Sequence, residues 1–138
     1  MKTYPNVKLH FDLIERIAQE KDTEIKKELC HQDIALFPAF CRDSIRMADE
    51  AAEESMQMGH LIGEKYPLEY YKNRVAYMYR MPRYPSFKTL AIIYEKEKEY
   101  DKAIKICERA ISVGCVDDGT KGGMVERLRK LKTKKEAL

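Results

Sequence analysis

The chain has 138 residues, of which 44% are hydrophobic and 36% are charged, and its formal net charge is +3 at pH 7. This length suits one domain, and the hydrophobic content argues against intrinsic disorder. The sequence has no apolar run of about 18 residues and no secretory signal at its start, so we expect neither a membrane span nor secretion. We therefore expect a single cytoplasmic, all-α domain over residues 1–138.

Residues 7–40 carry the pattern of a helical hairpin. The apolar residues fall on one face of each expected helix: Leu13, Ile14 and Ile17, then Ile25, Leu29 and Cys30. We expect the second helix to end at Pro38, because proline is unfavourable inside a helix. Ile25 and Asp33 stand where a close helix crossing would need small residues.

Residues 41–82 are expected to form an irregular helical insertion. A helix of about five turns is predicted first, ending at Gly63, and Pro67 is well placed to begin the next helix. The inner face of the first helix is predicted to be rich in small residues: Ile45, Ala48, Ala52, Met56 and Gly59. Its solvent face is predicted to be acidic: Asp43, Asp49, Glu50, Glu53 and Glu54.

Tyrosines alternate with cations between residues 66 and 84. The aromatic members are Tyr66, Tyr70, Tyr71, Tyr77, Tyr79 and Tyr84, and the cationic members are Lys72, Arg74, Arg80 and Arg83. Such a segment can stack on bases or hold a peptide. The plainer interpretation is that Tyr70, Tyr71 and Tyr77 pack inward. We take Tyr71 and Arg74 as candidate partner-binding residues.

Residues 84–115 predict two amphipathic helices joined by a short turn. The first helix has an apolar stripe with Ser86 placed to cap it: Phe87, Leu90, Ala91 and Tyr94. The second helix has its own stripe: Tyr100, Ala103, Ile104, Cys107, Ala110 and Ile111. Gly114 is the expected stop. The alanines allow the two axes to approach to roughly 8 Å, so we predict a tight antiparallel hairpin.

This stretch resembles a tetratricopeptide repeat, a helix–turn–helix unit of about 34 residues. The matching positions are Phe87, Leu90, Ala91, Tyr94, Tyr100, Ala103 and Ala110. Cys107 replaces the usual Phe, and Cys115 stands where Pro is usual. The resemblance implies a short stack of about six helices, in which residues 7–40 are a degenerate repeat or a simple hairpin.

Residues 120–135 are expected to form a capping helix after a glycine-containing loop. Met124, Leu128 and Leu131 fall on one apolar face. The outer face is strongly basic: Arg127, Arg129, Lys130, Lys132, Lys134 and Lys135. This face is either simply solvated or a contact for nucleic acid. Attraction between it and the acidic 43–54 face is a route to self-association.

No constellation of an enzyme or metal site can be assembled. His10, His31 and His60 are scattered, and Cys30, Cys41, Cys107 and Cys115 have no metal-ligand spacing, so we interpret these cysteines as reduced thiols. The glycines at 119–123 lack the phosphate-loop pattern. We therefore expect no catalytic residue, cofactor or metal.

In the resembling family, ligands lie along the first helix of each repeat. The resemblance therefore implies a partner-binding surface at Lys88, Ile92, Glu95 and Lys96. Ile92 stands where a carboxylate clamp would want Asn, so a mixed apolar and charged peptide groove is the better inference. We predict a non-enzymatic adaptor that binds a protein or peptide. The alternative is a small nucleic-acid-associated or regulatory protein that uses segment 66–84 and the basic helix.

Overall fold

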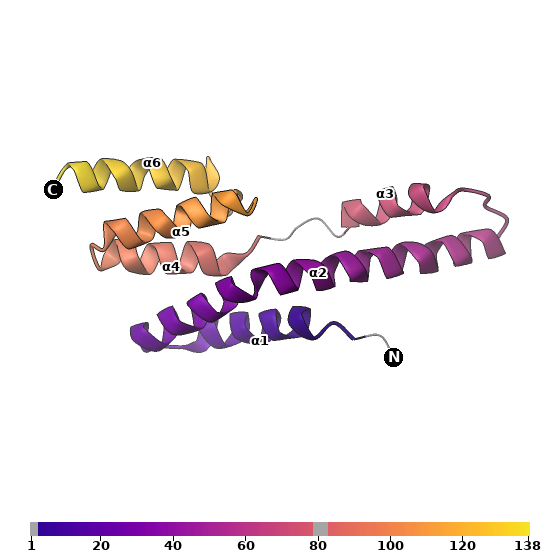
Figure 1. Cartoon of the computed structure of the whole chain (residues 1–138), viewed down its shortest axis with the longest axis horizontal. Coiled ribbons are helices and arrows are strands. Elements are labelled where there is room, and N and C mark those ends of the chain that lie inside the picture. The colour runs from indigo at the N-terminus through magenta and orange to yellow at the C-terminus, as the bar shows by residue number, and fades with distance from the viewer. Residues whose placement is uncertain (1–2, 79–82) are drawn as a thin grey trace. The chain divides into compact units, whose positions relative to one another are not determined.

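The computed structural model describes residues 3–78 and 83–138, and within these ranges every regular element is a helix (Figure 1). The helices are α1 (Pro5–Gln19), α2 (Thr23–Leu61), α3 (Leu68–Met78), α4 (Pro85–Lys96), α5 (Tyr100–Ser112) and α6 (Gly123–Glu136). The predicted all-α class is confirmed. None of the helices in these ranges combines the length and the apolarity that crossing a bilayer requires.

The chain divides into two compact units. Unit 1 consists of residues 1–10 and 36–82, and Unit 2 of residues 11–35 and 83–138. Helices α1 and α2 each supply a segment to both units, and each unit is described by itself.

Helix α2 does not end at Pro38, so this expectation was wrong. The helix continues through the proline to Leu61. An internal proline removes one backbone hydrogen bond and costs about 3 kcal/mol or more. Pro38 is exposed, whereas Phe37 and Phe40 on either side of it are buried. Burial of these two rings gives about 2 kcal/mol each, which is enough to keep the helix intact.

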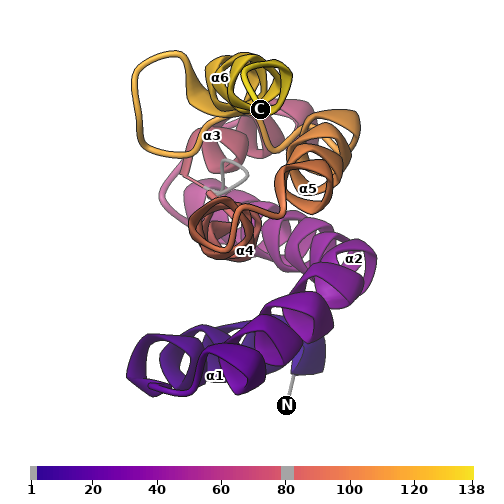
Figure 2. The same cartoon turned by 90° about the vertical axis from the view of Figure 1, so that its left-hand side faces the viewer.

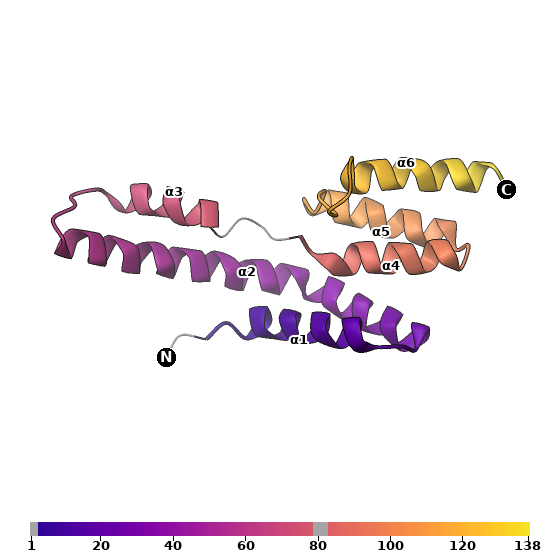
Figure 3. The same cartoon turned by 180° about the vertical axis from the view of Figure 1, so that it is seen from behind.

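In Unit 1, α2 and α3 pair as antiparallel helices around Ala52, Tyr71 and Val75 (Figure 3). Gly59 of α2 makes room for Tyr71, because a Cβ atom there would lie 2.5 Å from the Tyr71 hydroxyl. Gly63 ends α2 with a positive φ of 93°, as predicted.

Two residues of α2 in Unit 1 face the opposite way from the prediction. Asp43, expected on the acidic solvent face, is buried and accepts a 2.8 Å hydrogen bond from the Asn6 N–H. It thereby caps the start of α1, where free amide groups and the helix dipole favour a carboxylate. Ile45, expected on the inner face, is 63% exposed.

In Unit 2, α4 and α5 form the predicted hairpin. The buried face of α4 is Ser86, Phe87, Leu90, Ala91 and Tyr94, and that of α5 is Ala103, Ile104, Ile106, Cys107 and Ala110. Helix α5 ends at Gly114 as expected, with the Cys115 N–H donating to the Ala110 carbonyl at 2.8 Å. Met124 and Leu131 bury one side of α6, and Leu128 is half-buried.

Two local expectations in Unit 2 were wrong. Ser86 does not cap α4, because the helix already begins at Pro85, and its hydroxyl instead donates to the Asp33 carboxylate at 2.6 Å. Ile25 is 48% exposed, whereas Leu29 and Cys30 are buried. Ile25 lies in the first turn of α2, where its N–H donates to the Asp22 carboxylate at 3.1 Å.

Candidate partner-binding surface

One flank of α4 carries three of the residues expected to contact a partner. Lys88, Ile92 and Glu95 follow the spacing i, i+4, i+7 and are all half-buried, while Lys96 is exposed. Glu95 forms an ion pair with Lys134 of α6, so this flank borders the last helix. Figure 2 shows α5 to one side of α4 and α6, with the loop before α6 on the other side.

A hollow of about 170 Å³ lies where α4, this loop and α6 meet, and we refer to it as the α4–α6 hollow. Its charged lining is Glu95, Lys121, Glu126, Arg127, Lys130 and Lys134. Four of these side chains are cations and two are carboxylates. The hollow is therefore cationic before its internal ion pairs are considered.

Ion pairs neutralise part of this charge. Arg127 Nε lies 2.9 Å from Oδ2 of the buried Asp118. Burial opposes ionisation of Asp118, but hydrogen bonds from Thr120 and Arg127 outweigh it and lower the pKa of this carboxyl group. Glu126 pairs with Arg129 at 2.5 Å, and this contact lowers the Glu126 pKa.

Two lysines of the hollow, Lys121 and Lys130, have no ion-pair partner within the described part of the chain. The charge of Lys130 nevertheless contributes to the lowered pKa of Glu126, and Glu95 is already engaged by Lys134. An opposite charge that enters the hollow can pair with these lysines without breaking an existing contact. The geometry therefore suits a carboxylate-bearing segment.

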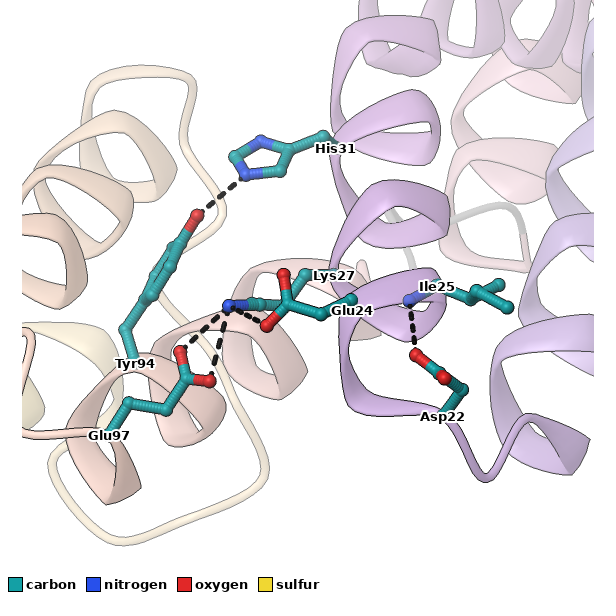
Figure 4. A network of polar contacts seen from close by, with 7 residues as sticks. All are labelled: Asp22, Glu24, Ile25, Lys27, His31, Tyr94 and Glu97. Carbon is teal, nitrogen blue, oxygen red and sulfur yellow. Dashed lines mark hydrogen bonds and ion pairs between the residues drawn. The ribbon is translucent and has the colours of Figure 1, made fainter.

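The opposite side of α4 is fixed by a polar network that sequence reasoning missed (Figure 4). Lys27 of α2 lies 2.9 Å from Glu97 and 2.8 Å from Glu24, and these hydrogen bonds, the one with Glu24 first, raise the Lys27 pKa. The Tyr94 hydroxyl lies 2.8 Å from His31 Nε2. Lys27 and Glu97 are far apart in sequence, so no local sequence pattern predicts this contact.

A buried carboxylate ties α2 to the start of α4. Asp33 is fully buried and accepts hydrogen bonds from Ser86 at 2.6 Å and from the Tyr84 hydroxyl at 3.0 Å. The Tyr84 hydroxyl also lies 2.5 Å from the Asp33 carbonyl oxygen. A signal existed here, because Asp33 shares an apolar stripe with Leu29 and Cys30, and a polar residue on such a stripe needs buried partners.

The tyrosine segment is only partly buried: Tyr66 and Tyr70 are exposed, so the interpretation that Tyr70 packs inward was wrong, whereas Tyr71 does pack inward. Tyr71 is 1% exposed and donates to Glu64 at 2.8 Å, and burial, followed by this contact, raises its pKa to about 12. Tyr71 therefore supports the α2–α3 pair and presents no free ring to a partner. Arg74 is exposed, 5.6 Å from the Tyr70 ring centroid. Tyr79 and Arg80, and the side chain of Tyr77, lie outside the described residues.

Fewer cations of the basic helix α6 are available to a ligand than its sequence indicates. Four of its six predicted outer cations form ion pairs: Arg127 with Asp118, Arg129 with Glu126, Lys134 with Glu95, and Lys135 with Asp101. Of this set, Lys130 and Lys132 form no ion pair among the described residues. The uncompensated positive charge is therefore local to a few positions.

The cysteines show no sign of activation. All four are free thiols, and burial raises the pKa of Cys30 to about 12 and that of Cys107 to about 11. Within residues 3–78 and 83–138, no three potential ligand side chains are grouped around a possible metal position.

Comparisons of the chain with protein-family models, with curated proteins and with solved structures find no match. The likeness to a tetratricopeptide repeat therefore rests on the spacing of residues 84–115 alone.

Proposed function

We propose that this protein is a non-enzymatic adaptor of the tetratricopeptide type that docks a protein segment in the cytoplasm. The segment lies along the flank of α4 and enters the α4–α6 hollow. The observation that carries this proposal is that two lysines, Lys121 and Lys130, form no ion pair among the described residues and lie in a hollow bordered by that flank.

The two parts of the surface have different tasks. Ile92, half-buried on the flank, supplies apolar contact area, and the lysines set the orientation of the segment and speed its association. Lys27, His31 and Asp33 hold α4 in place through the contacts described above. A surface that is fixed before binding loses little conformational entropy on complex formation.

The test needs a partner and a matched pair of lysine variants. Affinity capture from the native host supplies candidates, and isothermal titration calorimetry then measures binding of each purified candidate to the full chain. We expect Lys130→Glu to weaken the complex about tenfold, because it removes an attraction and adds a repulsion. Lys132→Glu is the control, since Lys132 lies on the same helix but does not line the hollow.

The same pair of lysine variants distinguishes protein binding from the alternative function, nucleic-acid binding. A nucleic-acid ligand binds chiefly by releasing counterions, so both variants would weaken it similarly and its affinity would fall steeply with salt. A protein complex that loses affinity equally in both variants would contradict the proposed site.

A further inference from the structure

A second hollow lies in Unit 1, between the last turns of α2 and the facing side of α3. It measures about 310 Å³, and we call it the α2–α3 groove. Its lining is mostly apolar or aromatic, with Met58, Gly59, Ile62, Tyr71 and Val75, and its polar members are Ser55, Glu64 and Arg74. Gly59, Tyr71 and Val75 are buried and form its floor, whereas Met58 and Ile62 stand on its α2 wall.

The α2 wall exposes an unusual amount of apolar surface. Met58 is 69% exposed, Ile62 is 80% exposed, and the adjacent Leu61 is 86% exposed. Single exposed apolar residues are common, but three at the end of one helix and in the turn that follows it, beside an apolar groove, indicate a contact surface.

We propose that the occupant of the α2–α3 groove is the same surface of a second copy of this chain. The surface provides both a groove and an apolar ridge, so a two-fold arrangement places Met58 and Ile62 of each copy against the groove of the other. Such an isologous contact requires a self-complementary patch, and this patch satisfies that requirement in shape.

The charges around the groove are also self-complementary. Arg74 lines the α3 side and has no carboxylate partner within the described residues. Glu64 lines the same groove. When α2 of one copy faces α3 of the other, Arg74 approaches Glu64 of the partner copy at two symmetric places. This surface differs from the one proposed for the protein ligand, so the inference does not depend on that proposal.

The test is sedimentation equilibrium of the full chain from about 1 µM to about 500 µM, with variants of two exposed isoleucines, Ile62 in the turn after α2 and Ile45 within α2. We expect the wild-type chain to dimerise, and Ile62→Asp to raise the dissociation constant more than about 100-fold, because a carboxylate would enter an apolar contact. Ile45→Asp is the matched control and should leave the dissociation constant unchanged, since Ile45 is exposed on α2 outside the groove. Ile62 is itself exposed, so circular dichroism should report an intact fold in both variants.

A second matched pair tests the polar contact. Arg74→Glu should weaken the dimer about tenfold, whereas Lys72→Glu, on the same helix but outside the groove, should change it by less than about twofold. If the wild-type chain stays monomeric at the highest concentration, the inference is wrong. This holds even if the groove proves to bind a different protein. A dimer that is equally sensitive to Ile45→Asp and Ile62→Asp also overturns the inference.

Discussion

The α2–α3 pair of Unit 1 and the α4–α5 hairpin of Unit 2 are built on the same principle but completed differently. Both pairs have small residues where they pack together, Gly59 beside the Tyr71 ring in the first and the buried Ala103 and Ala110 in the second. In Unit 2, contacts from α2 and α6 reach the free sides of α4 and α5. In Unit 1, Met58 and Ile62 stay exposed beside the α2–α3 groove.

The difference shows that small residues at a crossing and a complete core are separate properties. Small side chains allow two helices to approach closely. Whether the remaining apolar surface is covered depends on a third element, which here is present for the α4–α5 hairpin. We therefore expect equivalent substitutions to cost more free energy in the α4–α5 hairpin than in the α2–α3 pair.

The largest expected effect comes from breaking the anchor of α4. Asp33→Ala should lower the free energy of unfolding by about 3 kcal/mol, because the Ser86 hydroxyl loses its buried acceptor and a buried space opens. Urea unfolding followed by circular dichroism measures this change. Asp12→Ala, at an exposed aspartate of the same unit, should change stability by less than about 0.5 kcal/mol. Equal effects of the two substitutions would show that the anchor contributes nothing.

The next effect compares the two crossings directly. Ala103→Leu should cost about 2 kcal/mol, because the fully buried site between α4 and α5 has no room for the added atoms. Gly59→Ala should cost less than about 1 kcal/mol. Its new methyl group displaces the flexible Glu64 carboxylate and forces the buried Tyr71 ring to shift, which costs about 1–2 kcal/mol, and the better helix propensity of alanine returns about 1 kcal/mol.

Thermal and urea unfolding of these two variants give the ranking. If Gly59→Ala were as costly as Ala103→Leu, the α2–α3 pair would be as tightly packed as the hairpin. The contrast between the two regions would then be wrong.

Sequence periodicity predicted most of what is local in this fold. The stripe of Phe87, Leu90, Ala91 and Tyr94 is buried as expected, and Gly63 and Gly114 end their helices. These features depend on neighbouring residues, whose side chains share a helix face or whose backbone must adopt a positive φ. Local rules are therefore sufficient for them.

The same reasoning failed where distant residues decide the outcome. Pro38 is tolerated because the buried rings of Phe37 and Phe40 stabilise the helix around it, and Asp33 is buried because Ser86 reaches it from another helix. The pairing of Glu95 with Lys134 similarly brings together two helices separated by α5. None of these partners can be identified from spacing within one helix.

The smallest effect concerns the ends of α4 and α2, where the same backbone motif carries different residues. Lys98 follows α4 with a φ of 60°, and Gly63 follows α2 with a φ of 93°. In both places the next N–H donates back across the turn, from Glu99 to Tyr94 at 2.8 Å and from Glu64 to Gly59 at 2.9 Å. A left-handed conformation costs a residue with a Cβ atom about 1 kcal/mol, and glycine adopts it freely.

Exchanging the two residue types should therefore change the free energy of unfolding in opposite directions. Lys98→Gly should raise the free energy of unfolding by about 0.5 kcal/mol, because relief of backbone strain exceeds the entropy that glycine adds to the unfolded chain. Gly63→Lys should lower it by about 1 kcal/mol. No atom lies within 4 Å of a Cβ at position 63, so this loss would come from the backbone alone. Thermal melts of both variants measure the pair, and a stabilising Gly63→Lys would show that the end of α2 has a different conformation in solution.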